Sequence, residues 1–275
     1  MRAPITKDTA LCMSLAGTPT NIGTRFHNYL YEQLGLDFIY KAFTTTDLPA
    51  AIAGIRALAI RGCGISMPYK EACLQYVDEV DDSARAIESV NTIVNSDSHL
   101  HAYNTDYIAV KALLAASRAA AGDTFAVLGA GGMAKAVAAA LHDRGLRAGT
   151  VVARNERAGR ALAQRYGYDW QATLDDARPQ LLINATPVGM DGGPGTGQLS
   201  FPAAAVGDAR IVFDVVASPA LTPLIRLAQS LDKTVVTGAE VIMLQAVEQF
   251  VLYTGVRPSG ELAQRASELS REPSP

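Results

Sequence analysis

The stretch VLGAGGMA, residues 127–134, decides the fold that this sequence predicts. It closes an apolar run expected to form a strand over 124–128 and opens an alanine-rich run expected to form a helix over 133–144. Small residues at such a turn let the backbone approach a pyrophosphate at the helix N-terminus, where unpaired N–H groups favour an anion. A glycine turn also serves plain strand-to-helix connections, but the strand–turn–helix context favours dinucleotide binding. The turn residues expected to contact the dinucleotide are Gly129, Ala130, Gly131, Gly132, Met133 and Ala134.

Outward from this turn, short β-rich runs alternate with helical stretches along almost the whole chain. This alternation is typical of βα units and predicts an α/β fold with parallel sheets. We expect two domains. The first is a substrate-binding domain over 1–106, completed by C-terminal helices over 238–275, and the second is a Rossmann-like dinucleotide-binding domain over 107–237.

The composition of the chain argues against several classes of protein. The 275 residues are 49% hydrophobic and 19% charged, and the net charge of −3 comes without any block of like charges that would suit nucleic acid. No apolar run reaches the ~18–20 residues of a membrane span. Three cysteines without a CxxC pair, and four histidines without an HxxxH pair, predict neither a disulfide framework nor a metal site. We therefore expect a cytoplasmic, metal-free protein. As separate expectations, it acts on a small molecule and is a monomer or homodimer.

The residue after the second strand of the predicted Rossmann-like domain bears on which dinucleotide would bind. NAD-binding folds place an acidic residue there, about 20 residues after the glycine turn, against the ribose hydroxyls. Here a strand expected over 149–153 is followed by Arg154. A guanidinium offers paired donors to a 2′-phosphate, so the sequence favours NADP over NAD. The alternative is that Arg154 is an ordinary solvated loop residue.

A lysine in the first domain stands where a strand breaks. A short strand expected over 64–67 is stopped by Pro68, and a helix expected over 70–78 presents Lys70 at its start. A surface lysine is the usual interpretation, but the helix dipole disfavours a cation at this end, which favours a functional role.

A second polar group lies at the ends of two predicted neighbouring strands. Asn91 is on a strand expected over 89–95, and Asp106 follows a strand expected over 99–104. Amides, hydroxyls and a carboxylate that converge there would suit a polyol, although turn and cap chemistry explains the same residue types.

A set of motifs in a fixed order along nearly the whole chain resembles those of the shikimate dehydrogenase family. The motifs are SMPYKE (66–71), SVNTIV (89–94), YNTD (103–106), GAGGMAKA (129–136), NATPVGM (184–190) and LQAVEQF (244–250). The resemblance implies two α/β domains with the active site in the cleft between them. It also implies reversible NADP-linked oxidation of the C3 hydroxyl of shikimate to 3-dehydroshikimate, with Lys70 and Asp106 as the catalytic pair. A general base or proton relay is needed because the hydroxyl proton must leave with the hydride.

The resemblance also implies further binding residues, and some of them depart from the family's pattern. The substrate-binding positions are Asn21, Gly23, Ser66, Asn91 and Gln245, and the cofactor-binding positions beyond the glycine turn and Arg154 are Asn184, Thr186, Pro187 and Gly238. The family has two serines where this chain has Asn21 and Gly23, and a tyrosine where it has Ala217.

These departures resemble the shikimate dehydrogenase-like branch, and they predict weak oxidation of shikimate or activity on a closely related hydroxylated cyclohexene or cyclohexane carboxylate. Arg25 is an alternative partner for the substrate carboxylate. Two other functions stay open: a quinate/shikimate dehydrogenase with mixed cofactor use, and a non-catalytic NADPH-binding regulatory protein. The retained Lys70 and Asp106 argue against the regulatory protein.

Overall fold

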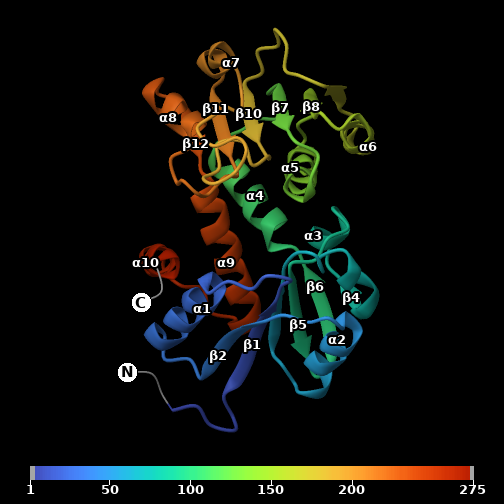
Figure 1. The fold of residues 1–275 in the computed structure, drawn as a ribbon, viewed down its shortest axis with the longest axis vertical. Coiled ribbons are helices and arrows are strands. Elements are labelled where there is room, and N and C mark those ends of the chain that lie inside the picture. The colour runs from blue at the N-terminus through green and yellow to red at the C-terminus, as the bar shows by residue number, and fades with distance from the viewer. Residues whose placement is uncertain (1–3, 273–275) are drawn as a thin grey trace. The chain divides into compact units, whose positions relative to one another are not determined.

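The structure, a computed structural model, describes residues 4–272, and these form two compact units (Figure 1). The first unit comprises the chain up to Thr105 and again from Met243, and the second comprises Asp106–Ile242. Each unit has its own six-stranded sheet. The first unit is therefore built from two stretches of sequence that a whole second unit separates.

The sheet of the first unit is mixed. Its strands follow the order β2-β1-β3-β5-β6-β4. β1 runs parallel to β2 and β3, whereas β5 runs antiparallel to β3 and β6, which corrects the expectation of parallel sheets for this unit. A two-residue turn at Asp97 and Ser98, both with positive φ, joins β5 to β6, and such a turn joins antiparallel neighbours. The strands are β1 (Ala10–Leu15), β2 (Phe38–Phe43), β3 (Gly62–Ile65), β4 (Glu79–Val80), β5 (Thr92–Ser96) and β6 (His99–Tyr103).

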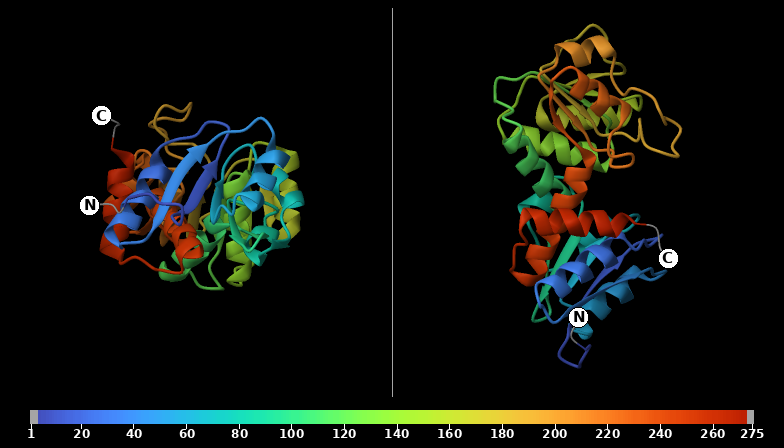
Figure 2. Two further views of the ribbon diagram at one scale, coloured as in Figure 1. Left: turned by 90° about the horizontal axis from the view of Figure 1, so that it is seen from below. Right: turned by 90° about the vertical axis from the view of Figure 1, so that its left-hand side faces the viewer.

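Helices cover both faces of this sheet. On one face, Ile52 and Ile55 of α2 pack into a core with residues of β1, β3, β5 and β6. On the other face, α1 and the C-terminal helices α9 and α10 share a core that includes Phe26, Tyr31 and Phe250. Figure 2 shows α10 beside α1. The helices are α1 (Ile22–Gln33), α2 (Leu48–Ala57), α3 (Asp82–Arg85), α9 (Gly238–Thr254) and α10 (Gly260–Arg271).

The sheet of the second unit has the doubly wound order β12-β11-β10-β7-β8-β9, and every pairing in it is parallel. This is the strand order of a Rossmann fold. The strands are β7 (Phe125–Leu128), β8 (Gly149–Val152), β9 (Asp169–Gln171), β10 (Leu181–Asn184), β11 (Ile211–Asp214) and β12 (Thr234–Val236). The helices are α4 (Thr105–Ala116), α5 (Gly132–Asp143), α6 (Glu156–Tyr166), α7 (Ala203–Asp208) and α8 (Pro223–Ser230). The expected two-domain α/β fold with a Rossmann-like domain is confirmed.

The helix expected over 70–78 is wrong. The structure has a 3₁₀ helix over Ala72–Tyr76, and Lys70 lies in the turn before it. The Asp78 N–H donates to the Leu100 carbonyl at 3.0 Å, and the Asp78 carboxylate accepts from the Leu100 N–H at 2.7 Å. These bonds favour strand β4 beside β6 over a continued helix. The short elements β4, α3, β9 and α7 were not predicted, because their residues show neither helical periodicity nor a strand-like run of β-branched residues.

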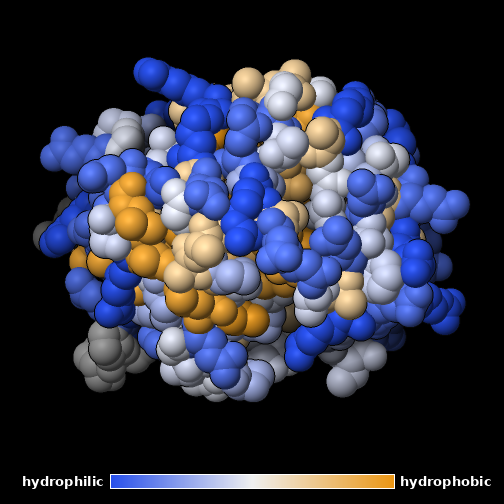
Figure 3. Space-filling view, turned by 90° about the horizontal axis from the view of Figure 1, so that it is seen from above, coloured by the Kyte–Doolittle hydropathy of each residue, from blue (hydrophilic) through white to orange (hydrophobic). Residues whose placement is uncertain are grey.

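The surface and the cysteines show few special features. The face in Figure 3 is largely hydrophilic, with apolar residues in small groups. Cys12, Cys63 and Cys73 are buried free thiols. Within residues 4–272, no helix combines the length and the apolar character that a bilayer crossing needs.

Candidate active site

The turn after β7 and the loop after β10 lie against each other at the carboxyl edge of the second sheet. β7 and β10 are neighbours from which the chain winds toward opposite ends of the sheet, and ligands of open α/β sheets bind at such a point. Gly129 has a φ of +118°, and a Cβ there would lie 2.9 Å from the Ala185 carbonyl oxygen and 3.0 Å from Thr186 Cγ2. Glycine is therefore required at position 129, and the structure brings two of the expected cofactor-binding segments together.

The N-terminus of α5 is open at its first residues. Gly131 precedes the helix and Gly132 begins it; both are exposed, and a Cβ on either would meet no atom of the described chain within 4 Å. The chain itself does not need glycine here, whereas a pyrophosphate lying on the helix N-terminus would. Ala130 and Met133 are half-buried, and Ala134 is fully buried beneath the turn. These residues fit a dinucleotide, whose phosphates the N–H groups of Gly131 and Gly132 would hold.

Asn184 holds the loop after β10 together. Its Oδ1 accepts hydrogen bonds from the N–H and the hydroxyl of Thr186, at 3.1 and 2.6 Å. Its Nδ2 donates to the Val188 carbonyl at 3.0 Å and to Asp214 Oδ1 at 2.9 Å. Asp214 is fully buried, and this burial raises the pKa of its carboxyl. Because the Asn184 amide has no donor or acceptor left, it supports the loop, and the half-buried Thr186 and exposed Pro187 are its more accessible residues.

The loop after β11 lies close to the first residue of α9. A Cβ on Gly238 would lie 2.3 Å from the carbonyl oxygen of Val216, so glycine allows this approach. Ala217, where the resemblance implies a tyrosine, is half-buried in the same loop. Glycine at position 238 therefore allows the backbone of this loop to pack closely against the start of α9.

Arg154 is exposed at the carboxyl end of β8, next to the glycine turn. The Gly129 N–H donates to the carbonyl of Val152, the last residue of β8, at 2.8 Å, and this bond joins the turn to the strand. Arg160, on the following helix, is already engaged: its Nε donates to Glu156 at 2.8 Å and its guanidinium lies 4.2 Å from the centre of the Trp170 ring. Of the exposed arginines here, Arg154 directly follows the strand and Arg157 lies on the helix, so we take Arg154 as the candidate for a 2′-phosphate.

Asn91, Thr105 and Gln245 converge in the first unit. Asn91 Oδ1 accepts from the N–H and the hydroxyl of Thr105, at 2.7 and 3.2 Å, and that hydroxyl lies 3.3 Å from Gln245 Oε1. The Lys70 carbonyl accepts a hydrogen bond from the N–H of Val90, the residue before Asn91, at 2.9 Å. Asp106 follows Thr105 as the second residue of α4. The main chain at Lys70 and the amides of two expected substrate contacts thus lie in one neighbourhood.

The loops after β1 and β3 hold three further expected contacts: Asn21, Gly23 and Ser66. Hydrogen bonds of 2.9 Å join these loops, from the Gly17 N–H to the Met67 carbonyl and from the Ser66 N–H to the last residue of β1. Asn21 and Ser66 are exposed, and the Asn21 side chain makes no capping bond to α1. A Cβ on Gly23 would lie 3.6 Å from the hydroxyl of the β2 tyrosine, an ordinary contact, so a side chain fits there.

The guanidinium of Arg25 is engaged within the first unit. It donates to the backbone carbonyl of Glu272, just after α10. This contact does not favour the alternative in which Arg25 takes the carboxylate of a substrate.

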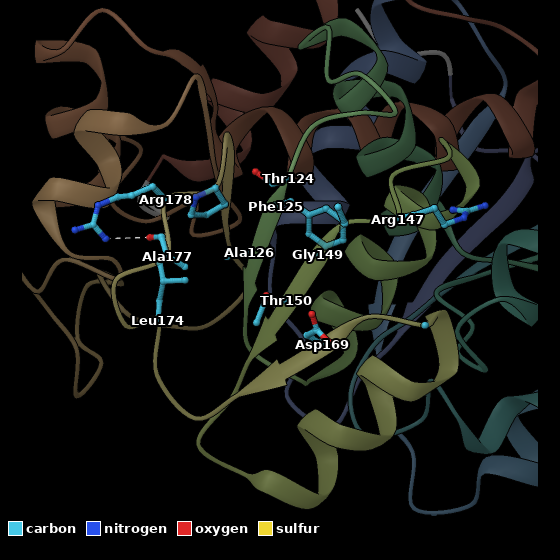
Figure 4. Close-up of a pocket in the computed structure, with 13 residues that line it drawn as sticks. Thr124, Phe125, Ala126, Arg147, Gly149, Thr150, Asp169, Leu174, Ala177 and Arg178 are labelled. Atoms are coloured by element: carbon cyan, nitrogen blue, oxygen red, sulfur yellow. Dashed lines mark hydrogen bonds between the residues drawn. The ribbon is translucent and has the colours of Figure 1, made fainter.

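A pocket of about 370 Å³ lies at the opposite, amino edge of the second sheet (Figure 4). Thr124, Gly149 and Asp169, at the starts of three strands, line it. The guanidinium groups of Arg147 and Arg178 extend away from its centre, and Arg178 pairs with Asp208 at 3.1 Å. Because the pocket lies at the other end of the strands from the glycine turn, it is separate from the candidate dinucleotide site.

The motifs do not single out Gln249, which the structure places behind Asn91. Its amide Nε2 lies 3.3 Å from the Asn91 carbonyl and its Oε1 lies 3.1 Å from His27 Nε2. Gln249 is four residues after Gln245 and so shares its face of α9, and this spacing is the signal that could have found it.

Known proteins resemble this chain over nearly its whole length. The model of the shikimate dehydrogenase substrate-binding domain matches residues 21–93. A shikimate dehydrogenase-like protein of Haemophilus influenzae is 52% identical, over 97% of this chain and 98% of its own.

Solved structures agree with this likeness. A shikimate 5-dehydrogenase-like protein superposes with a TM-score of 0.97 at 52% identity, over 98% of this chain and all of its own. The shikimate 5-dehydrogenase of Thermus thermophilus in complex with NADP(H) and shikimate superposes with a TM-score of 0.83 at 30% identity, over 95% and 99% of the two chains. A quinate dehydrogenase of Corynebacterium glutamicum in complex with NAD has the same TM-score at 27% identity, over 95% and 98%.

The glycine turn at the switch point, the polar group around Asn91 and the full-length likeness agree with one another. They confirm the resemblance that the motifs suggested: the chain belongs to the shikimate dehydrogenase family, a family of oxidoreductases that act on CH–OH groups.

Proposed function

We propose that this protein interconverts shikimate, or a closely related hydroxylated cyclohexene or cyclohexane carboxylate, and its 3-dehydro form, with NADP as the cofactor. The observation that carries the proposal is the convergence of Asn91, Thr105 and Gln245 beside the main chain of Lys70. Amide and hydroxyl groups held in this way suit the vicinal hydroxyls of a polyol ring. The relative bound to NADP(H) and shikimate supports the same assignment.

In this proposal the two units have different tasks. The second unit binds NADP through the turn over 129–134 and Arg154, and NADP supplies the hydride acceptor when it is bound. The first unit binds the ring. Lys70 takes the hydroxyl proton as hydride leaves the carbon, and Asp106 orients the Lys70 ammonium and a substrate hydroxyl.

Variants of the catalytic pair test the proposal. Lys70→Ala and Asp106→Ala should each lower kcat on the order of 10²–10⁴-fold, as expected for loss of a positioned proton-transfer group. The dissociation constant for NADP should hardly change. Formation of NADPH with shikimate, quinate and amino analogues measures the activity; near wild-type turnover in either variant would overturn the role of that residue.

We further propose that shikimate is a poor substrate. A carboxylate taken out of water needs donors, and Gly23 and Ala217 offer no hydroxyl. Gly23→Ser combined with Ala217→Tyr should lower the KM for shikimate by roughly tenfold or more, since each bond to a charged acceptor is worth about 1.5–3 kcal/mol. The space beside Gly23 admits the serine. A wild-type enzyme that saturates with micromolar shikimate would contradict this proposal.

The same panel of substrates distinguishes the alternatives. Faster turnover of quinate with NAD would indicate a quinate/shikimate dehydrogenase, and NADPH binding without any turnover would indicate a regulatory protein. The three buried free thiols suit a reducing compartment, so we place the protein in the cytoplasm, as a monomer or homodimer.

A further inference from the structure

Behind Asn91, four buried side chains form one continuous chain of hydrogen bonds. His27 Nε2 lies 3.1 Å from Gln249 Oε1, Gln249 Nε2 donates to the Thr92 hydroxyl at 3.0 Å, and that hydroxyl donates to Asn91 Oδ1 at 2.9 Å. The exposed fractions of the four residues are 1%, 7%, 0% and 4%. The chain connects α1, α9 and the start of β5 to an expected substrate contact.

Two backbone groups fix the direction of every bond in this chain. Gln249 Nε2 lies 3.3 Å from the Asn91 carbonyl oxygen, which can only accept, so Oε1 must be the end that faces His27. Asn91 Oδ1 lies 2.7 Å from the Thr105 backbone N–H, which can only donate. His27 must therefore donate through Nε2, and all the bonds run from His27 toward Asn91.

The surroundings of His27 agree with this direction. Burial lowers the pKa of His27 to about 4, so its ring is neutral near pH 7. The ring stacks on Tyr40 with the centroids 4.4 Å apart. Its Nδ1 has no hydrogen-bond partner among the described residues, which suits an unprotonated nitrogen better than an N–H group.

Gly64 leaves the room that this arrangement needs. A Cβ on Gly64 would lie 2.9 Å from the Tyr40 hydroxyl and 3.1 Å from Gln249 Nε2. A side chain at position 64 would therefore push the Gln249 amide out of line, and glycine on this buried strand allows the amide to reach Thr92.

We propose that Gln249 is a positioning residue for substrate recognition, which acts through Thr92 to hold the amide of Asn91. Three donors, from Thr92 and Thr105, meet at Asn91 Oδ1, so the Nδ2 group is held facing away from the buried chain. Asn91 then recognises a substrate oxygen by donating Nδ2–H. The inference rests on the proposed function, in which Asn91 contacts the ring hydroxyls.

Removal of the Gln249 amide tests the inference, because loss of a positioning residue should change KM much more than kcat. Gln249→Leu should raise the KM for shikimate about tenfold, with kcat within about threefold of wild type, because a loosened Asn91 amide costs a substrate hydrogen bond. The dissociation constant for NADP should stay the same. Thr92→Val, which is close to isosteric, should raise KM by a similar factor. The double variant should be no worse than the stronger single variant, because both act along one route.

Asn95 provides a matched control for simple loss of stability. It is a buried amide on the same strand, whose Nδ2 donates to the Ile55 carbonyl and whose Oδ1 accepts from the Ser98 N–H, each at 2.9 Å. Asn95→Ala should lower the Tm without changing KM. The inference is overturned if Gln249→Leu and Thr92→Val keep KM within about twofold of wild type, or if Asn95→Ala raises it equally. Should Gln249→Leu not fold, Thr92→Val alone decides.

The tautomer of His27 separates failure of this inference from failure of the proposed function. The ¹⁵N spectrum of histidine-labelled wild-type protein should show a neutral His27 protonated at Nε2. A wild-type protein that oxidises neither shikimate nor any related hydroxylated cyclohexene or cyclohexane carboxylate overturns the proposed function, whereas the Nε2–H tautomer would still support the orientation of Gln249. An Nδ1–H tautomer would overturn the inference even in an active enzyme.

Discussion

The imidazole of His27 makes the stability of the first unit depend on pH. Its pKa is lowered from 6.5 to about 4 by burial, so between these values the unfolded chain binds a proton that the folded chain does not. The free energy of unfolding should therefore fall as the pH drops from about 6.5 towards 4, by on the order of 3 kcal/mol in total. Denaturant unfolding at pH 7 and pH 4.5 measures the difference.

A ring that does not titrate provides the control for His27. His27→Phe keeps an aromatic group against Tyr40, and its stability should vary less with pH over the same interval. Asp78 contributes little to the difference, because the hydrogen bond from Arg56 lowers the pKa of that carboxyl from 3.8 to about 2 and this interval lies below pH 4.5. Equal pH dependence in variant and wild type would show that another group is responsible.

Arg154 should decide the choice between NADP and NAD. Its exposed guanidinium stands at the end of β8, beside the glycine turn. Arg154→Ala should weaken NADP binding by roughly 10- to 100-fold, the value of a charge-assisted contact, and leave NAD binding unchanged. Calorimetric titration of both cofactors measures the effect. Arg178→Ala, at the opposite edge of the same sheet, should alter neither, and equal affinity of the wild type for both cofactors would contradict the assignment.

At the scale of elements, two glycines of one turn should respond differently to substitution. Gly129→Ala must place a Cβ against the Ala185 carbonyl at a φ of +118°, so both the Tm and the affinity for NADP should fall. Gly131→Ala meets nothing in the described chain, so it should weaken NADP binding at an unchanged Tm. Thermal unfolding with and without NADP compares them. If Gly131→Ala bound NADP normally, the pyrophosphate would not lie on this helix N-terminus.

Sequence patterns predict those elements that carry a local signal and miss those that distant contacts decide. The start of the second unit was predictable because β7, the glycine turn and α5 carry their own local signals: an apolar run, small residues and helix formers. The path of residues 70–78 was not, because contacts with Leu100 decide it. The antiparallel course of β5 relative to β6 follows from the two-residue turn at Asp97 and Ser98, both of which have positive φ.

The candidate site likewise contains residues that sequence motifs indicate and residues whose roles only the structure reveals. Lys70, Asn91 and Asp106 stood out because they carry motifs, and they remain predictions until variants are measured. The roles of Asn184 and Gln249 depend on which atoms face which neighbours, and a sequence contains no such information. Motifs predict where a site lies, whereas hydrogen-bond direction emerges only from the packed structure.

At the scale of the whole molecule, the two units should differ when they are expressed alone. The second unit is one continuous stretch, so a fragment over 106–242 should unfold cooperatively and bind NADP. A fragment over 1–105 lacks α9 and α10, which leaves the apolar face around Phe26 and Tyr31 uncovered, and it should aggregate. Circular dichroism on heating and sedimentation compare the fragments; a soluble, cooperatively folded 1–105 fragment would contradict the prediction.

The interrupted first unit has a consequence for the order of events on the ribosome. Its strands are synthesised before the second unit, but the helices that complete their core are encoded after it, from Met243 onward. At about 5–20 residues per second, synthesis of the intervening unit occupies on the order of ten seconds. During that time the face of the first sheet that α9 and α10 cover stays incomplete, while the second unit is free to fold. A stop codon soon after Ile242 would therefore leave a dinucleotide-binding unit intact and deprive the earlier part of the first unit of the helices that complete its core.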